Sequence, residues 1–111
     1  MTQQDIDAYL QSLPGAWIDY PYGPDVVVYK VGKASEESEK MFALVVEGSV
    51  PLRVSLRCDP QLAVLLREKY ESIQPGYNLN KKYWNTIICT GQVGDEELKD
   101  LARLSHRLAS E

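Results

Sequence analysis

A chain of 111 residues with 25% charged and 44% apolar residues has the composition of one globular domain, which excludes a largely disordered chain. The formal net charge of −4 excludes the strongly basic character of a dedicated nucleic-acid-binding protein. No apolar run approaches the roughly 20 residues of a membrane-spanning helix, and the N-terminus lacks the basic and apolar regions of a signal peptide. We therefore expect a single domain over residues 1–111, in the cytoplasm and not in a membrane.

The charge is distributed unevenly along the chain. Residues 1–47 contain eight acids and three bases, which gives −5. Residues 48–92 contain three acids and six bases, which gives +3, and residues 93–111 contain five acids and three bases, which gives −2. A basic middle between acidic ends permits a local positive patch on an acidic protein.

The first half of the chain predicts a helix followed by three strands. Thr2 is expected to cap the helix, with Asp5 as a weak capping box, and Pro14-Gly15 to end it. Its apolar stripe is Ile6, Tyr9, Leu10 and Leu13. A structured turn over 16–25 and an exposed hairpin loop over 32–40 separate the elements that follow. The strands are predicted over 26–31, 41–47 and 52–57, the last with strict alternation of apolar and polar residues.

The second half predicts a helix, a strand and a final helix. Asp59-Pro60 is an acidic cap followed by proline at the first helical position, and the helix stripe of Leu62, Leu65, Leu66 and Tyr70 extends to about residue 71. A fourth strand is predicted over 84–90. Asp95 is expected to cap the last helix, whose packed face is Leu98, Leu101, Ser105 and Leu108.

These elements follow the order α-β-β-β-α-β-α. Short connections and alternating strands favour an antiparallel sheet of about four or more strands covered by helices, which is an α+β fold.

Residues with catalytic or metal-binding chemistry are few. Cys58 and Cys89 lie 31 positions apart and, with His106, are too few for a structural zinc site, so we expect no metal and no cofactor. In a cytoplasmic chain the two cysteines are expected to be reduced. Cys58 precedes a helix start, where the dipole can favour a thiolate, but a structural thiol is the preferred interpretation, as a cap is for Asp59. No phosphate-loop, dinucleotide, zinc-protease or serine-hydrolase motif occurs, so we do not expect an enzyme.

The segment 75–86, PGYNLNKKYWNT, is the densest in aromatic, amide and basic side chains and contains no acid. Loops seldom hold so many aromatic and amide groups unless the fold or a partner requires them. The segment is therefore the strongest candidate for a contact surface.

Several segments together resemble the MmcQ/YjbR family. They are PYGPD (21–25), the strand pair VVVYKV and MFALVV, LRVSLRCDPQLAVLLREKY (52–70), PGYNLNKKYWNTI (75–87) and ELKDLARLSHRL (97–108). They cover nearly the whole chain in order, and Asn-Lys-x-x-Trp is the most specific spacing. The resemblance implies a bacterial protein with a CyaY-like fold described as a double wing, no established enzymatic activity and a proposed DNA-binding role. The acidic character of this chain departs from that role.

The candidate nucleic-acid contacts come from the basic middle of the chain. Lys81, Lys82 and Asn80 belong to the 75–86 segment, and Arg53 and Arg57 are expected on the wet face of the third strand. Lys30 extends them into a positive strip if it lies on a neighbouring strand with the same facing. Tyr83, Trp84, Tyr77 and Tyr22 are candidates for stacking or for lining a groove. Each has a structural alternative: Trp84 can anchor the loop, Asn78 and Asn80 can close turns, and the charged strand residues can simply face solvent.

Two functions follow from these residues. The first is weak, backbone-dominated binding of double-stranded DNA through the local basic patch. The alternative is a protein-interaction or small-ligand module, in which the PYGPD corner and the 75–86 segment form a groove. Convergence of their aromatic residues on an apolar concavity would favour the alternative.

Overall fold

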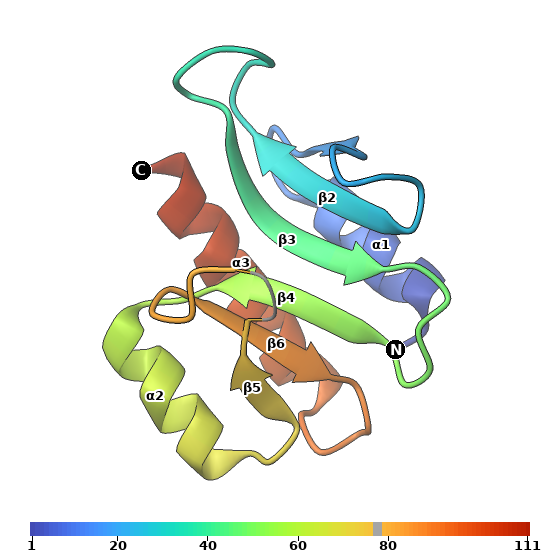
Figure 1. Cartoon of the computed structure of the whole chain (residues 1–111), viewed down its shortest axis with the longest axis vertical. Helices are drawn as coiled ribbons and strands as arrows, with labels where there is room; N and C mark the ends of the chain where they lie inside the picture. Colours follow the sequence, from blue (N-terminus) through green and yellow to red (C-terminus); the bar gives the residue numbers. More distant parts are fainter. Residues whose placement is uncertain (77–78) are drawn as a thin grey trace.

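The computed structural model describes residues 1–76 and 79–111. It contains a sheet whose strands are β1 (Trp17–Asp19), β2 (Val26–Val31), β3 (Lys40–Val46), β4 (Arg53–Arg57), β5 (Ile73–Pro75) and β6 (Trp84–Ile88). The helices are α1 (Gln3–Ser12), α2 (Pro60–Lys69) and α3 (Asp95–Ser110). Helices α1 and α3 lie behind the sheet in Figure 1, and α2 lies beside β5 and β6. The predicted α+β class, with an antiparallel sheet covered by helices, is confirmed.

The sheet has six strands in the order β1-β2-β3-β4-β6-β5, and every neighbouring pair is antiparallel. The predicted element order was incomplete, because it lacked the two edge strands β1 and β5. Each has only three residues, which is too short for a period of two to be recognised. Pro75 is compatible with β5 because an edge strand needs hydrogen bonds on one side only.

The predicted starts of the first two helices are confirmed. The Thr2 hydroxyl accepts from the Asp5 N–H at 3.1 Å, and the Asp5 carboxylate accepts from the Thr2 N–H at 3.0 Å. The Asp59 carboxylate accepts from the N–H groups of the first turn of α2. The predicted cap of α3 was wrong by one residue: Gly94 is the N-cap, and Asp95 is the first helical residue, where its charge suits the positive end of the helix.

The helices bury one apolar stripe each against the sheet. Ile6 and Leu10 of α1 are fully buried, as the periodicity predicts. The buried face of α2 differs from the predicted one: Ala63 and Leu66 are buried, whereas the predicted Leu65 is 60% exposed. On α3 the fully buried residues are Leu98, Ala102, Ser105 and Ala109, and the predicted Leu101 and Leu108 are only half-buried. Small side chains at 102 and 109 let the helix approach the sheet closely.

Ser105 is a fully buried polar residue that joins α3 to two strands. Its Oγ donates to the Phe42 carbonyl of β3 at 2.5 Å and accepts from the Arg57 N–H of β4 at 2.9 Å. The backbone pairing of β3 with β4 covers Ala43 to Val45, so the serine bonds backbone groups just beyond that pairing. The hydroxyl therefore satisfies two buried groups that the sheet leaves without strand partners.

Replacing Ser105 with alanine is expected to lower the free energy of unfolding by about 1–3 kcal/mol, because it leaves a buried N–H and a buried carbonyl without partners. Chemical denaturation followed by circular dichroism measures this change. Ser110→Ala is the matched control: it removes an exposed hydroxyl that bonds only its own helix, so we expect a change within about 0.5 kcal/mol. Equal effects of the two substitutions would contradict the role assigned to Ser105.

Cys58 is buried in the core at the end of β4, and both cysteines are free thiols, as predicted. Burial, together with the neighbouring Asp59 carboxylate, raises the pKa of the Cys58 thiol to about 11. Burial therefore opposes the thiolate that the helix start could favour, and the structural role of Cys58 stays a prediction.

The raised pKa predicts a loss of stability at alkaline pH. An unfolded thiol ionises at about pH 8.5, so the contribution is fully present below that pH and is lost as pH rises through about 11. Denaturant unfolding between these values should show a steeper decline for the wild type than for Cys58→Ala. Tyr29 also has a raised pKa, from burial and its bond to Asp7, but it contributes equally to both proteins. Parallel pH profiles would contradict the assignment.

Candidate functional site

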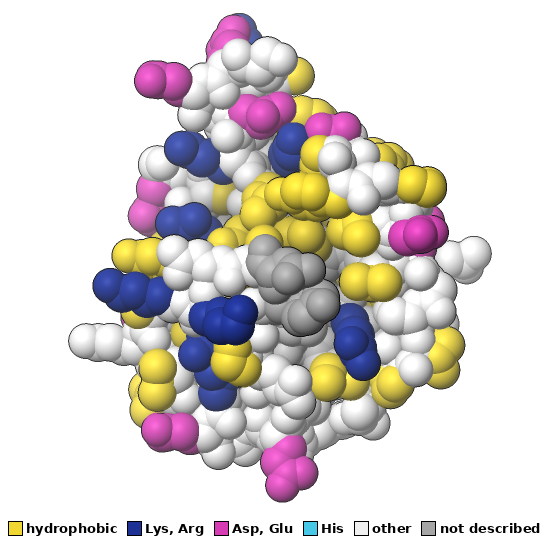
Figure 2. All heavy atoms as spheres, viewed as in Figure 1, with side chains coloured by type: hydrophobic (Ala, Val, Ile, Leu, Met, Phe, Trp, Pro, Cys, Tyr) yellow, Lys and Arg dark blue, Asp and Glu magenta, His cyan; other side chains and the backbone are white. Residues whose placement is uncertain are grey.

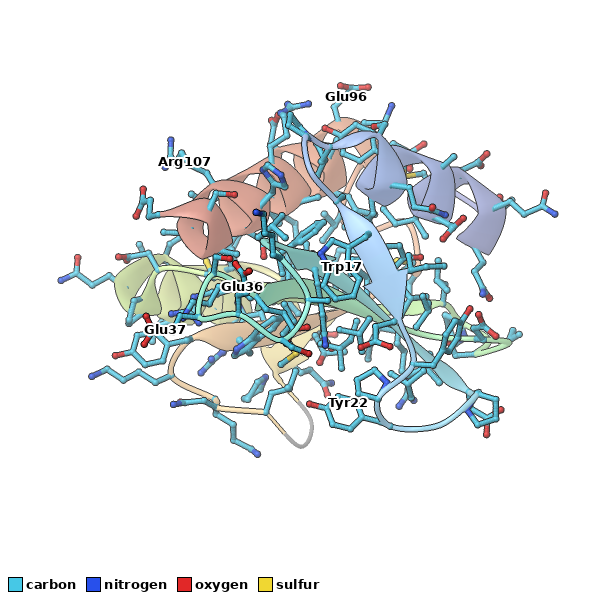
Figure 3. The ribbon with its side chains drawn as sticks, turned by 90° about the horizontal axis from the view of Figure 1, so that it is seen from above. Trp17, Tyr22, Glu36, Glu37, Glu96 and Arg107 are labelled. Carbon is cyan, nitrogen blue, oxygen red and sulfur yellow. The ribbon has the colours of Figure 1, made fainter. Side chains whose placement is uncertain are left out.

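The sheet has one covered face and one open face. Side chains alternate along each strand, so the residues between those that contact α1 and α3 point the other way. The strand register sets Leu44, Ser55 and Thr86 side by side across three strands of the open face. The described residues of the loop before β6 lie on this side of the sheet (Figures 1 and 3).

A groove of about 360 Å³ lies on the open face. Tyr22, from the predicted PYGPD corner, and Leu79, from the loop before β6, form its walls. Tyr22 is 63% exposed and extends on the side of the sheet opposite α1 and α3 (Figure 3). The floor comes from four strands and consists of Val26, Leu44, Val46, Arg53, Ser55 and Thr86. The corner and the loop thus meet at one concavity.

Arg67 of α2 holds the loop before β6 in place. Its Nε donates to the Asn85 Oδ1 at 2.6 Å, and its guanidinium also donates to the carbonyls of Lys81 and Trp84. The buried Asn85 amide donates to the Ala63 carbonyl of α2 at 3.2 Å. Sequence reasoning missed Arg67, because its role depends on a helix meeting a loop 14 residues away.

Two residues of the loop shape its backbone. The Asn80 Oδ1 accepts from the Lys82 N–H at 3.0 Å, and the Asn80 carbonyl accepts from the N–H groups of Tyr83 and Trp84. These bonds are the turn-closing alternative given for Asn80. Gly76 lies so close to Trp84 that an added Cβ would meet the Trp84 Cβ at 2.8 Å. Tyr77 and Asn78, also named as candidates, lie outside the described residues.

Tyr83 brings together two of the predicted cations. The Arg57 guanidinium lies 5.4 Å and the Lys82 ammonium 5.5 Å from the centre of its ring. Lys81 is the exposed neighbour of Lys82, and Arg53 lies four residues before Arg57 on the same side of β4. None of these four cations forms an ion pair with another described residue. Figure 2 shows several basic side chains on this face, with most acids toward the margins.

Lys30 does not join this cluster. It lies on β2, two strands from β4, and its ammonium pairs with Asp19 at 2.9 Å and Glu39 at 3.6 Å. The hydrogen bond from Lys30, with one from the Tyr20 N–H, lowers the pKa of Asp19 below its usual value. The ammonium also lies 5.4 Å from the Trp17 ring centre. The positive strip predicted to run through Lys30 is therefore interrupted by carboxylates.

Trp84 is only 4% exposed, so packing holds its ring and leaves it inaccessible for stacking on a base. The structural alternative for this residue matches its position. Of the aromatic candidates within the described residues, Tyr22 lines the groove and Tyr83 lies in the cation cluster. Among the described residues, the convergence of aromatic side chains that would favour the alternative function is therefore limited to Tyr22.

The residues with catalytic chemistry have structural contacts. The His106 Nε2 lies 2.6 Å from the Pro14 carbonyl, and its ring packs edge-on against Phe42 with centroids 5.3 Å apart. No three described His, Cys, Asp or Glu side chains lie close enough together to hold a metal ion. Among the described residues, no helix has the length and apolar character needed to span a membrane.

Comparison with known sequences identifies relatives over most of the chain. The model of the YjbR family matches residues 11–108. The uncharacterised protein YbdF of Escherichia coli O157:H7 is 35% identical over 97 residues, which cover 86% of this chain and 74% of YbdF. The uncharacterised protein YjbR of Escherichia coli K12 is 30% identical over 111 residues, which cover 98% of this chain and 87% of YjbR.

Solved structures agree with the sequence relatives. The crystal structure of Deinococcus radiodurans protein DR2400, a DUF419 domain, superposes with a TM-score of 0.92 at 37% identity, covering 99% of this chain and 79% of that one. A Pseudomonas syringae protein superposes with a TM-score of 0.80 at 28% identity, covering 98% and 99% of the two chains. The family match, the relatives and the shared fold lead to one conclusion: this chain belongs to the YjbR family.

Proposed function

We propose that this YjbR-family domain is a non-catalytic cytoplasmic protein that binds double-stranded DNA weakly through the open face of its sheet. The observation that carries the proposal is the cluster of Arg57, Tyr83 and Lys82 beside Lys81 and Arg53, in which none of the cations is paired with a described carboxylate. Unpaired cations that share one surface can contact neighbouring phosphates and release counterions.

The geometry supports backbone contact rather than reading of base edges. The side-chain oxygens of Asn80 and Asn85 already accept hydrogen bonds within the protein, from the Lys82 N–H and the Arg67 Nε respectively. Trp84 is buried, so Tyr83 is the half-exposed ring of the cluster. The cluster offers four cations to the DNA, and the overall charge of −4 opposes the approach of phosphate beyond this patch.

This proposal predicts weak binding with a modest dependence on salt. Two to four phosphate contacts give a log–log slope of about −2 to −4. The double variant Arg57→Gln/Lys82→Gln removes two of the contacts, so we expect weaker binding and a slope reduced in magnitude by about 2. Fluorescence anisotropy of a labelled duplex, titrated from about 50 to 200 mM salt, measures both quantities.

The matched control is Lys33→Gln/Arg107→Gln, which changes the net charge equally but lies in the β2–β3 loop and on α3, away from the open face. Figure 3 shows Arg107 on the helical side of the molecule. We expect the control to bind almost as the wild type does. If the control weakens binding as much as the double variant, or if the wild type does not bind at the lowest salt, the DNA proposal is abandoned.

A second function is favoured by a separate observation. Tyr22 and Leu79 line the same groove, although one comes from the corner before β2 and the other from the loop before β6. This is the arrangement expected of a protein-interaction or small-ligand module, with an apolar concavity and a few polar groups.

A further inference from the structure

The groove on the open face presents an unusually apolar surface to solvent. Val26, Leu44 and Val46 form its floor, and Val46 is 40% exposed. Tyr22 and Leu79 also line it. Hydrophobic side chains gather over this part of the face in Figure 2. Leaving such a surface in water is unfavourable, and a contiguous apolar hollow of this kind commonly marks a binding site.

A pair of hydroxyl groups lies within the same groove. The Oγ of Ser55 and the Oγ1 of Thr86 are 2.8 Å apart, and both residues line the hollow. Each hydroxyl has one hydrogen to donate. One hydrogen is used within the pair, so the accepting hydroxyl keeps its own hydrogen for another acceptor. The Ser55–Thr86 pair can therefore donate one hydrogen bond to an acceptor atom of a ligand that lies in the groove.

Arg53 adds a positive charge to this donor. Its side chain lines the groove, on the same side of β4 as Ser55, and forms no ion pair with any described residue. A guanidinium presents a planar fork of N–H groups that matches a carboxylate with two parallel hydrogen bonds. The polar groups of the groove thus suit an anion, and its walls suit a hydrocarbon.

We propose that the groove binds a small organic carboxylate, with its apolar body on the valine and leucine floor and its carboxylate on Arg53 and the Ser55–Thr86 pair. One guanidinium matches one negative charge, which favours a carboxylate over a phosphate dianion. The groove volume of about 360 Å³ lies in the range of small-ligand sites, which suits a medium-chain or single-ring carboxylate. This proposal takes up the second function above and does not depend on DNA binding.

Octanoate is the probe that tests the proposal, in a titration of the ¹⁵N-labelled full chain followed by two-dimensional NMR. We expect progressive amide shifts at Val26, Leu44, Val46, Ser55 and Thr86. Octanol lacks the charge and acetate lacks the hydrocarbon, so both should bind at least about tenfold more weakly. Arg53→Gln should weaken octanoate binding by about tenfold, because it removes a charge-assisted hydrogen bond. The matched control Arg107→Gln, on α3, should bind octanoate as the wild type does.

The variants keep the test independent of folding. Arg53 is exposed and its side chain supports no described ion pair, and the amide spectrum of Arg53→Gln reports directly whether the fold is intact. Thr86→Val is a second variant that keeps the side-chain shape and removes one hydroxyl of the pair, so it should also weaken octanoate binding. Shifts elsewhere on the protein, equal binding of octanol, or octanoate affinity unchanged in both variants would each overturn the proposal. The DNA titration uses other variants and another ligand, so the two proposals fail independently.

Discussion

The contact between the Arg67 guanidinium and the loop before β6 determines the shape of the open face. Arg67 bonds the Asn85 side chain and two loop carbonyls, and Asn85 in turn bonds the backbone of α2. Charge-assisted hydrogen bonds are stronger than neutral ones, and without the arginine the side-chain oxygen of the buried Asn85 would lose its donor. These bonds attach the loop before β6 to helix α2. The same loop contributes Leu79 to the groove and places Lys82 beside the Tyr83 ring.

The two faces of the sheet have different surroundings. Its covered face is closed by α1 and α3, and the buried Ser105 hydroxyl joins α3 to β3 and β4 where their pairing ends. On its open face, the apolar residues of the groove are not covered by any helix of the described chain (Figures 1 and 2). A sheet with only one covered face normally has a polar outer surface. The apolar floor is a local departure from that rule, and it coincides with the meeting of the corner and the loop.

Charge on this protein is organised locally. Asp19 and Glu39 form ion pairs with Lys30. The cations of the open face have no carboxylate partner among the described residues; they are Arg53, Arg57, Lys81 and Lys82. Salt screens interactions beyond about 8–10 Å, so a partner on the open face responds mainly to these near charges and less to the net charge. Tyr83 adds a ring that two cations share. The proposed DNA contact and the proposed carboxylate site therefore use adjacent parts of one face, with Arg53 at their border.

The sequence by itself determined the helix starts at Thr2 and Asp59, the longer strands and the α+β class, because capping and side-chain periodicity act over a few neighbouring residues. The resemblance of its segments, above all PGYNLNKKYWNTI, indicated the family. The sequence also marked the 75–86 segment and the PYGPD corner as candidate contact surfaces. Only the tertiary structure decided that Trp84 is buried, that Lys30 is neutralised by Asp19, and that Tyr22 and Leu79 meet across a groove. These facts depend on strand order and on contacts between residues far apart in the chain, and local patterns carry no information about either.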